Sequence, residues 1–194
     1  MTSFKSSEQP QDLDIEGAES RIPYTQFIFE ACMSHCKEIG THKHGCCVMQ
    51  RCLEKGSKAQ KMMLADVIIR HLQELIEDPF GNYLVQNVLK LESAEKSDMI
   101  FRVIAKDFIR LSQLKFSSNV IEKCLDSERV GSQVDQLFIG THENEDVTIA
   151  RCLGKQAKTR ATRVKFLTQR LMMHSFGNYV LQKALLVVNP GLRV

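Results

Sequence analysis

Residues 79–86 read PFGNYLVQ, and near-copies of this stretch occur at residues 43–50 (KHGCCVMQ), 115–122 (KFSSNVIE) and 175–182 (SFGNYVLQ). From its fourth residue on, each copy has a small polar or sulfur-bearing side chain, a variable residue, two apolar residues, and then Gln or Glu. A frame that recurs in this way predicts a repeat protein. On a helix, the first and last of these positions are four residues apart and lie on one face, so both can contact one ligand while the apolar pair faces inward.

The spacing between the copies predicts the fold class. Gln50 and Gln86 are 36 residues apart, as are Gln86 and Glu122, whereas Gln182 follows Glu122 by 60 residues, or one period plus about 24. A period near 36, with no Pro or Gly inside the apolar stretches, is typical of units of two or three helices in an α-solenoid. We therefore expect an all-α protein. The commoner function of such repeats is a helical scaffold that binds other proteins.

Two of the polar pairs fit purine bases. Glu122 offers two acceptor oxygens and no donor at neutral pH, which suits the adjacent N1–H and N2–H donors of guanine, and Ser118 fits beside it. Gln50 can bond N6 and N1 of adenine through its amide, and the small Cys46 leaves room for a purine. For either pair taken alone, a solvated helix face is the alternative to base reading.

The other two pairs fit uracil. Gln86 and Gln182 each present one donor and one acceptor, which match O4 and N3–H, and Asn82 and Asn178 can donate to O2. The variable residue of each frame can stack on a base, and an aromatic ring there contributes about 1–3 kcal/mol per base. The four stacking residues are Cys47, Tyr83, Asn119 and Tyr179.

The frame resembles the RNA-reading helix of Pumilio (PUF) family repeats over about residues 24–126 and 171–189. This resemblance implies three-helix repeats that each read one base of single-stranded RNA, with the first and fifth positions on the base edge and the second stacked between bases. It also implies adenine for the pairing of Cys with Gln. Because the family binds RNA antiparallel, the four pairs spell 5′-UGUA from the last repeat to the first.

The resemblance and the helical patterning together predict the domain organisation. Residues 1–20 are acidic and polar and are expected to form a disordered leader, and residues 21–194 a partial arc of PUF repeats. Phe27, Ala31 and Ile39 predict a buried stripe that ends at Gly40. The expected reading helices lie near 43–54, 79–91, 115–126 and 175–188.

Each unit is also expected to contain a short helix before the reading helix and a packing helix after it. The predicted packing helices are Lys58–Arg70 and Lys96–Lys106, and the predicted short helices are Leu72–Glu77 and Asp107–Leu111. The resemblance further implies a packing helix and a cap beyond the last reading helix. The chain is therefore expected to be either a fragment of a longer protein or a shortened family member.

The segment at about residues 129–170 departs from the repeat pattern. It contains a polar run at residues 140–146, and then a basic run without acidic residues. We expect an inserted, mobile loop, and the alternative is an arm that grips phosphate. The members of the basic run are Arg151, Lys155, Lys158, Arg160, Arg163, Lys165 and Arg170.

Charge and hydropathy set weaker bounds on function. The 26 basic and 23 acidic residues give a net charge of only +3, so charge alone does not indicate nucleic acid. Basic residues do flank the frames, where they can contact phosphate: Lys43, Arg51, Lys115, Lys123 and Lys183. The sequence has no long apolar run and no signal peptide, so we expect a soluble, cytoplasmic protein that does not bind membranes.

The residues that commonly carry catalysis or metals are not arranged for either. The seven cysteines include no Cys-x-x-Cys pair, so we expect no metal, no other cofactor and no disulfide. No histidine has a nucleophile or paired carboxylate at a recognisable spacing, and a surface role is expected for His174. We therefore expect no enzyme.

The resemblance implies a regulator of messenger RNA. Such a protein binds a UGUA element in 3′ untranslated regions. It represses translation of the messenger RNA, or lowers its stability, by recruiting repressor or deadenylation proteins on its convex face. The alternative is a protein-interaction scaffold, a truncated PUF paralogue with little RNA affinity. Binding to a UGUA RNA separates the two functions.

Overall fold

The computed structural model describes residues 26–126 and 160–188, and every regular element in these two ranges is a helix. The first three units each contain a packing helix, a short helix and a reading helix. They are α1 (Gln26–Ser34), α2 (Cys36–Gly40) and α3 (Gly45–Lys55); α4 (Lys58–Arg70), α5 (Leu72–Glu77) and α6 (Gly81–Leu89); and α7 (Ala94–Lys106), α8 (Phe108–Ser112) and α9 (Ser117–Leu125). The last unit contributes α13 (Arg160–Met172) and the reading helix α14 (Gly177–Val188).

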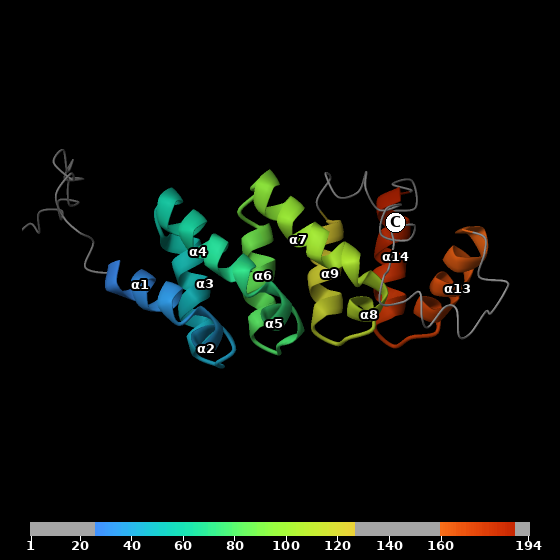
Figure 1. Cartoon of the computed structure of the whole chain (residues 1–194), viewed down its shortest axis with the longest axis horizontal. Coiled ribbons are helices and arrows are strands. Elements are labelled where there is room, and N and C mark those ends of the chain that lie inside the picture. The colour runs from blue at the N-terminus through green and yellow to red at the C-terminus, as the bar shows by residue number, and fades with distance from the viewer. Residues whose placement is uncertain (1–25, 127–159, 189–194) are drawn as a thin grey trace, which may run out of the picture.

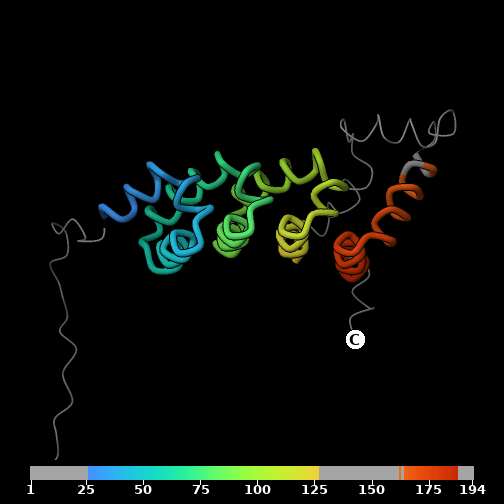
Figure 2. Tube along the Cα trace, turned by 90° about the horizontal axis from the view of Figure 1, so that it is seen from below, coloured from blue at the N-terminus to red at the C-terminus, as the bar shows by residue number. Residues whose placement is uncertain are grey.

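The units stack side by side along the long axis of the molecule (Figure 1). Reading helices α3, α6, α9 and α14 form one row, and packing helices α1, α4 and α7 form another (Figure 2). Each reading helix packs on the next, including α14 on α9, although residues 127–159 lie between these two in the sequence. The predicted all-α solenoid is confirmed, and α14 takes the place of the next reading helix after α9.

The predicted helices agree closely with the structure. Helices α4 and α5 have the expected bounds, and α7 and α8 differ from expectation by one or two residues. All four reading helices begin two residues later than expected, because the first residues of each frame form the turn that precedes the helix. The expected leader at residues 1–20 lies outside the described residues, as does most of the expected loop.

Part of the expected loop is helical, which corrects the prediction for residues 160–170. These residues form most of α13, in which Leu167 and Leu171 are buried. The helix forms because these leucines are four apart and this segment packs on α14 and α8, while polar residues, Thr168, Gln169 and Arg170, occupy the positions between them. The rest of the expected loop, residues 129–159, is not among the described residues.

The prediction for the N-terminal stripe holds for Ile39, which is half-buried against the core, and for the helix end at Gly40, but it is wrong for Phe27 and Ala31. Phe27 is 67% exposed and Ala31 is exposed, whereas Phe29, Cys32 and Cys36 are buried. Apolar residues occur on more than one side of this segment, so their spacing alone does not specify which face packs on α4. The segment is also two helices rather than one, since α1 ends at Ser34 and α2 begins at Cys36.

The inward apolar pairs hold the reading helices against the rest of each unit. Leu84 and Val85 of α6 are fully buried, as are the corresponding Val120 and Ile121 of α9. In α14, Val180 is buried and Leu181 is half-buried. The first repeat departs from this prediction, because Met49 is buried but Val48 is 46% exposed.

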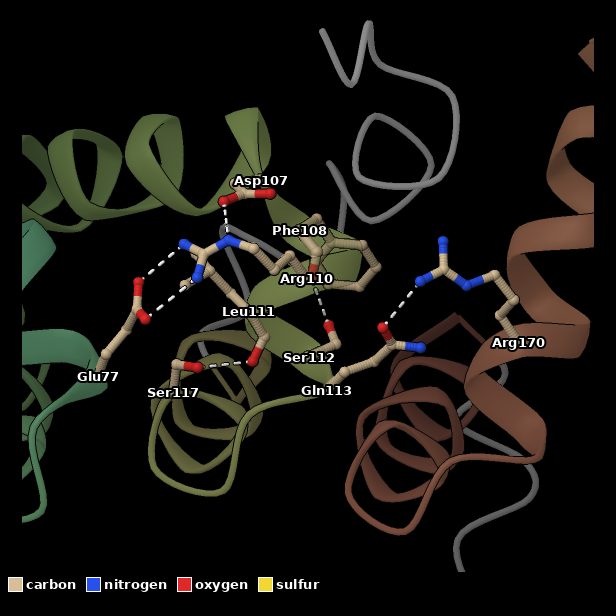
Figure 3. A network of polar contacts seen from close by, with 9 residues as sticks. All are labelled: Glu77, Asp107, Phe108, Arg110, Leu111, Ser112, Gln113, Ser117 and Arg170. Atoms are coloured by element: carbon tan, nitrogen blue, oxygen red, sulfur yellow. Dashed lines mark hydrogen bonds and ion pairs between the residues drawn. The ribbon is translucent and has the colours of Figure 1, made fainter. Parts of the chain in front are cut away.

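A small residue begins each reading helix because the helix starts in backbone contact with the short helix before it. A Cβ atom on Gly81 would lie 2.9 Å from both the Cα and the carbonyl oxygen of Leu75. The third repeat has Ser117 at this position instead, and its hydroxyl donates a hydrogen bond of 2.6 Å to the Leu111 carbonyl (Figure 3). The same close approach is thus achieved with a different side chain.

Polar contacts join neighbouring units along the row of short helices. Lys37 of α2 pairs with Glu74 of α5 at 3.3 Å, and Arg110 of α8 forms two bonds of 2.7 and 3.1 Å to Glu77 of α5. Arg170 of α13 donates to the Gln113 side chain at 3.0 Å (Figure 3). These contacts help to set the register between units. None of the helices in the described ranges is long and apolar enough to cross a membrane.

Candidate nucleic-acid interface

In three of the four repeats, the turn before the reading helix is closed by a side chain that accepts two backbone N–H groups. Asp78 Oδ1 accepts from Phe80 and Gly81 at 2.8 and 2.7 Å. His174 Nδ1 accepts from Phe176 and Gly177 at 3.2 and 3.3 Å, and His42 does the same in the first repeat. His174 therefore caps a helix instead of having only a surface role.

These caps were not predicted from the sequence, although a signal for them lies just before three of the four frames. His42, Asp78 and His174 each lie four residues before the first position of their frame. Asp is a preferred capping residue, and its alignment with the two histidines identifies the position. The third repeat has Leu114 there and so has no equivalent side-chain acceptor.

The first position of the frame is buried in three of the four repeats. Cys46, Asn82 and Ser118 are 3%, 0% and 2% exposed, and Asn178 is half-buried. Each side chain donates to a carbonyl of the preceding turn. Asn82 donates both amide hydrogens, to Asp78 at 2.9 Å and Pro79 at 3.0 Å, so the hydrogens expected to reach uracil O2 are bonded to backbone in this structure.

The same arrangement recurs at the other three repeats. Asn178 donates to the carbonyls of His174 and Ser175 at 2.7 and 3.0 Å. Ser118 donates to Lys115 at 3.2 Å, and the Cys46 thiol lies 3.3 Å from the Lys43 carbonyl oxygen. The first position thus anchors the start of the reading helix.

The glutamines at the fifth position are oriented by the asparagines at the first. Gln86 donates to Asn82 Oδ1 at 3.0 Å, and Gln182 donates to Asn178 Oδ1 at 3.0 Å. One amide hydrogen and the carbonyl oxygen of each glutamine remain for a ligand. Gln86 is half-buried and Gln182 is exposed, so both face the surface of the reading row.

Glu122 occupies the fifth position of the third repeat and is half-buried. Burial raises its pKa above the usual range, the positive charge of Lys183 acts to lower it, and the negative charge of Asp126 acts to raise it. At neutral pH the ionised side chain offers acceptors only, which is the pattern expected for guanine.

The four predicted stacking residues lie on the surface. Tyr83 and Tyr179 are 50% and 57% exposed, and Cys47 and Asn119 are also exposed. Each directly follows the anchored first position on a reading helix, and the reading helices lie side by side (Figure 2). The structure therefore repeats the same surface arrangement, a fifth-position polar group beside an exposed stacking residue, on four neighbouring helices.

Several basic residues near the frames already have carboxylate partners. Arg51 pairs with Glu54 at 2.7 Å, Lys123 pairs with Asp126 at 3.5 Å, and Lys183 also pairs with Asp126. The other two are Lys43 and Lys115, which are exposed and lie in the turns before α3 and α9. The Lys115 Nζ atom lies 5.4 Å from the centre of the Phe116 ring. Lys43 and Lys115 are the better placed of the five for phosphate contact.

The cysteines behave as packing residues where they are described. Cys32, Cys36 and Cys52 are buried free thiols. Burial raises the pKa of Cys32 to about 12 and that of Cys36 to about 11, which favours the neutral thiol over the metal-binding thiolate. Within the two described ranges, no group of His, Cys, Asp and Glu side chains is arranged to hold a metal ion.

The repeats match a known family model. The model of the Pumilio-family RNA-binding repeat matches residues 35–69, 71–105, 108–138 and 169–193. The chain belongs to the Pumilio family. The third PUF match extends through residue 138, past the last described residue of α9 and into the segment expected to be a loop.

Curated Pumilio relatives are much longer than this chain. The chain is 38% identical over 165 residues to Pumilio homology domain family member 4 of Saccharomyces cerevisiae, covering 82% of this chain and 16% of the relative. It is 33% identical over 165 residues to Pumilio homolog 12 of Arabidopsis thaliana, covering 84% of this chain and 24% of the relative. The chain thus spans a quarter or less of these two proteins.

Solved PUF domains share the fold. The Puf4 RNA-binding domain, bound to the HO endonuclease RNA 3′ UTR recognition sequence, is 35% identical with a TM-score of 0.62, and the match covers 86% of this chain and 46% of that domain. The yeast Puf5p RNA-binding domain bound to SMX2 RNA is 30% identical with a TM-score of 0.60, covering 83% of this chain and 43% of that domain. The PUF repeats described here correspond to less than half of either domain.

Proposed function

We propose that this chain binds single-stranded RNA sequence-specifically along the row of reading helices α3, α6, α9 and α14, with 5′-UGUA as its core element. The observation that carries this proposal is the repetition of one surface arrangement on four adjacent helices, with Glu122 at the fifth position of α9 and glutamine at that of the other three. A row of equivalent sites that differ in hydrogen-bonding pattern is what reading successive bases requires. The solved relatives that share this fold are bound to RNA.

Uracil is assigned to the second and last repeats. Asn82 accepts one hydrogen from Gln86, so the Gln86 amide is held with its carbonyl oxygen and remaining N–H available to N3–H and O4 of the base. The exposed ring of Tyr83 supplies a stacking surface beside it. For Asn82 to donate to O2 as well, one of its amide hydrogens must leave a backbone carbonyl and bond to the base.

Guanine is assigned to the third repeat and adenine to the first. The acceptor-only carboxylate of Glu122 complements two adjacent donors of guanine and repels the N1 acceptor of adenine. In the first repeat, the buried Cys46 presents no strong donor or acceptor, so Gln50 makes the base contact with adenine. The exposed Cys47 is a weaker stacking residue than tyrosine, so this site contributes least to affinity.

Repression of messenger RNA is the biological role that fits this binding. The Puf4 domain is bound to a recognition sequence from an mRNA 3′ UTR, which favours the same class of target for this chain. We propose that repressor or deadenylation proteins are recruited on the face opposite the reading row. Exposed apolar residues recur every 36 residues on the packing helices: Phe27 of α1, Met63 of α4 and Met99 of α7 are 67%, 53% and 39% exposed.

The exposed apolar row also favours the second candidate function, a protein-interaction scaffold with little RNA affinity. A binding titration separates the two, using a short RNA that contains UGUA and a scrambled RNA of the same length and composition. Preferential binding of the UGUA RNA supports RNA reading. Equal, weak binding of both RNAs would leave the scaffold as the better account.

A further inference from the structure

The third and last reading helices share a group of three charged side chains. Asp126 is the C-cap of α9, in a helical backbone conformation four residues after Glu122, so the two side chains lie on the same face. Lys183 of α14 forms an ion pair with Asp126 across the packed helices. Lys183 directly follows Gln182 of the last site, so the group lies between the proposed guanine site and the proposed uracil site next to it.

Lys183 is the basic group that acts on Glu122. The ionisable side chains of the helices packed most closely on α9 are Tyr83 of α6, Arg110 of α8, and Tyr179 and Lys183 of α14. Of these, Lys183 opposes the effect of burial on the Glu122 carboxyl group, while Asp126 at the C-cap of α9 reinforces that effect. Asp126 thus repels Glu122 but also holds the lysine that stabilises its charge.

Lys123 provides an internal comparison. It is adjacent to Glu122 in the sequence and pairs with the same Asp126 at 3.5 Å, yet it is not among the charges that shift Glu122. Successive residues on a helix point in different directions, so Lys123 reaches Asp126 without facing Glu122. Lys123 therefore serves as the control for Lys183.

We propose that Lys183 is a specificity-determining residue of the guanine site: its ammonium group, held by Asp126, keeps the half-buried Glu122 carboxylate ionised. This inference rests on the proposed reading of guanine by Glu122. An ionised carboxylate offers two acceptors, whereas a protonated one offers a donor and an acceptor, the pattern of a Gln amide. Protonation therefore converts a guanine site into one that accepts adenine or uracil.

The sign of the pH dependence follows from this chemistry. Guanine favours the ionised form of Glu122, so preference for guanine over adenine is full above the pKa of Glu122 and is lost as the pH falls through it. Removing the Lys183 charge raises that pKa further and moves the loss of preference toward neutral pH. Removing the Asp126 charge removes its repulsion of Glu122 but also breaks the ion pair that holds Lys183. The direction in which Asp126→Asn shifts the titration midpoint of Glu122 shows which of these two effects is larger.

The first test uses the free protein, so it does not depend on RNA. The carboxyl-carbon NMR signal of Glu122 is followed through an acid titration in the wild type and in Lys183→Met, Lys183→Arg and Lys123→Met. We expect Lys183→Met to move the Glu122 midpoint to higher pH, Lys183→Arg to restore it, and Lys123→Met to leave it at the wild-type position. Equal midpoints in the wild type and Lys183→Met would overturn the inference.

The second test measures specificity. Affinities for a UGUA RNA and a UAUA RNA are compared across the same pH range. We expect the preference for UGUA to disappear at a higher pH in Lys183→Met than in the wild type, and to be independent of pH in Glu122→Gln, which lacks the titrating group. A wild-type protein without preference at neutral pH contradicts the proposed function, whereas an unchanged pH profile in Lys183→Met contradicts the role of Lys183 alone.

Discussion

Gln86 donates an amide hydrogen to Asn82 at 3.0 Å, and Asn82 donates both of its own to backbone carbonyls of the preceding turn. The last repeat forms the same chain of bonds through Gln182 and Asn178. In this arrangement the turn fixes the asparagine, and the asparagine fixes the glutamine. The polar pair of a uracil site is therefore a supported unit and not two independent base contacts.

We expect Asn82→Ala to reduce both stability and RNA affinity. Asn82 is fully buried, so Asn82→Ala removes the side-chain bonds to the carbonyls of Asp78 and Pro79 and releases Gln86, while Asp78 keeps its bond from the backbone N–H of residue 82. The free energy of unfolding should fall by about 1–3 kcal/mol. Urea denaturation of the variant and the wild type measures this loss. The matched variant Asn178→Ala, at a half-buried position, should lose less stability. If Asn82→Ala has wild-type stability and RNA affinity, this series of hydrogen bonds contributes to neither.

We expect the third repeat to change its base preference when its polar pair is replaced by that of its neighbours. In Ser118→Asn/Glu122→Gln, the pair acquires the chemistry of Asn82 and Gln86, and α6 shows that an asparagine fits the buried first position. The preferred element should change from UGUA to UUUA in a competition assay with fluorescently labelled RNA. The single variant Glu122→Gln serves as the control for loss of the carboxylate. Continued preference for UGUA in the double variant would mean that the base is read elsewhere.

The cap at the last reading helix gives a stability prediction. His174→Ala removes the acceptor of two backbone N–H groups and should lower the free energy of unfolding by about 0.5–2 kcal/mol. His174→Asp should retain most of that stability, because Asp78 makes the equivalent bonds in the second repeat. Chemical denaturation of both variants and the wild type checks this. The cap assignment is wrong if the alanine and aspartate variants are equally stable.

The repeat architecture was predictable because it depends on local patterns. The inward pairs such as Leu84 and Val85 mark the buried face of each reading helix, and the polar breaks between apolar stretches mark the helix ends. These signals recur at a fixed period, so each repeat supports the interpretation of the others. The first unit was predicted less well, since apolar residues surround α1 and their spacing does not specify the face occupied by Phe29.

The site was predictable in its residue types but not in its bonds. The sequence indicates that Asn82 and Gln86 share a face, yet it does not show that backbone carbonyls take both Asn82 hydrogens. The contact between Lys183 and Asp126 could not be predicted from the sequence for another reason. The residues between α9 and α14 separate the two side chains in sequence, and only packing of the two helices brings them together.

The most direct test of the account is the affinity of the chain for a short single-stranded RNA containing UGUA, compared with the same RNA in which G is replaced by A. Adenine places its N1 acceptor against the Glu122 carboxylate where guanine has a donor, so at neutral pH the substitution should weaken binding by about 1–3 kcal/mol. That difference corresponds to roughly 5-fold to 150-fold in Kd. Equal affinity for the two RNAs would contradict the assignment of Glu122 and, with it, the reading of bases by this row of helices.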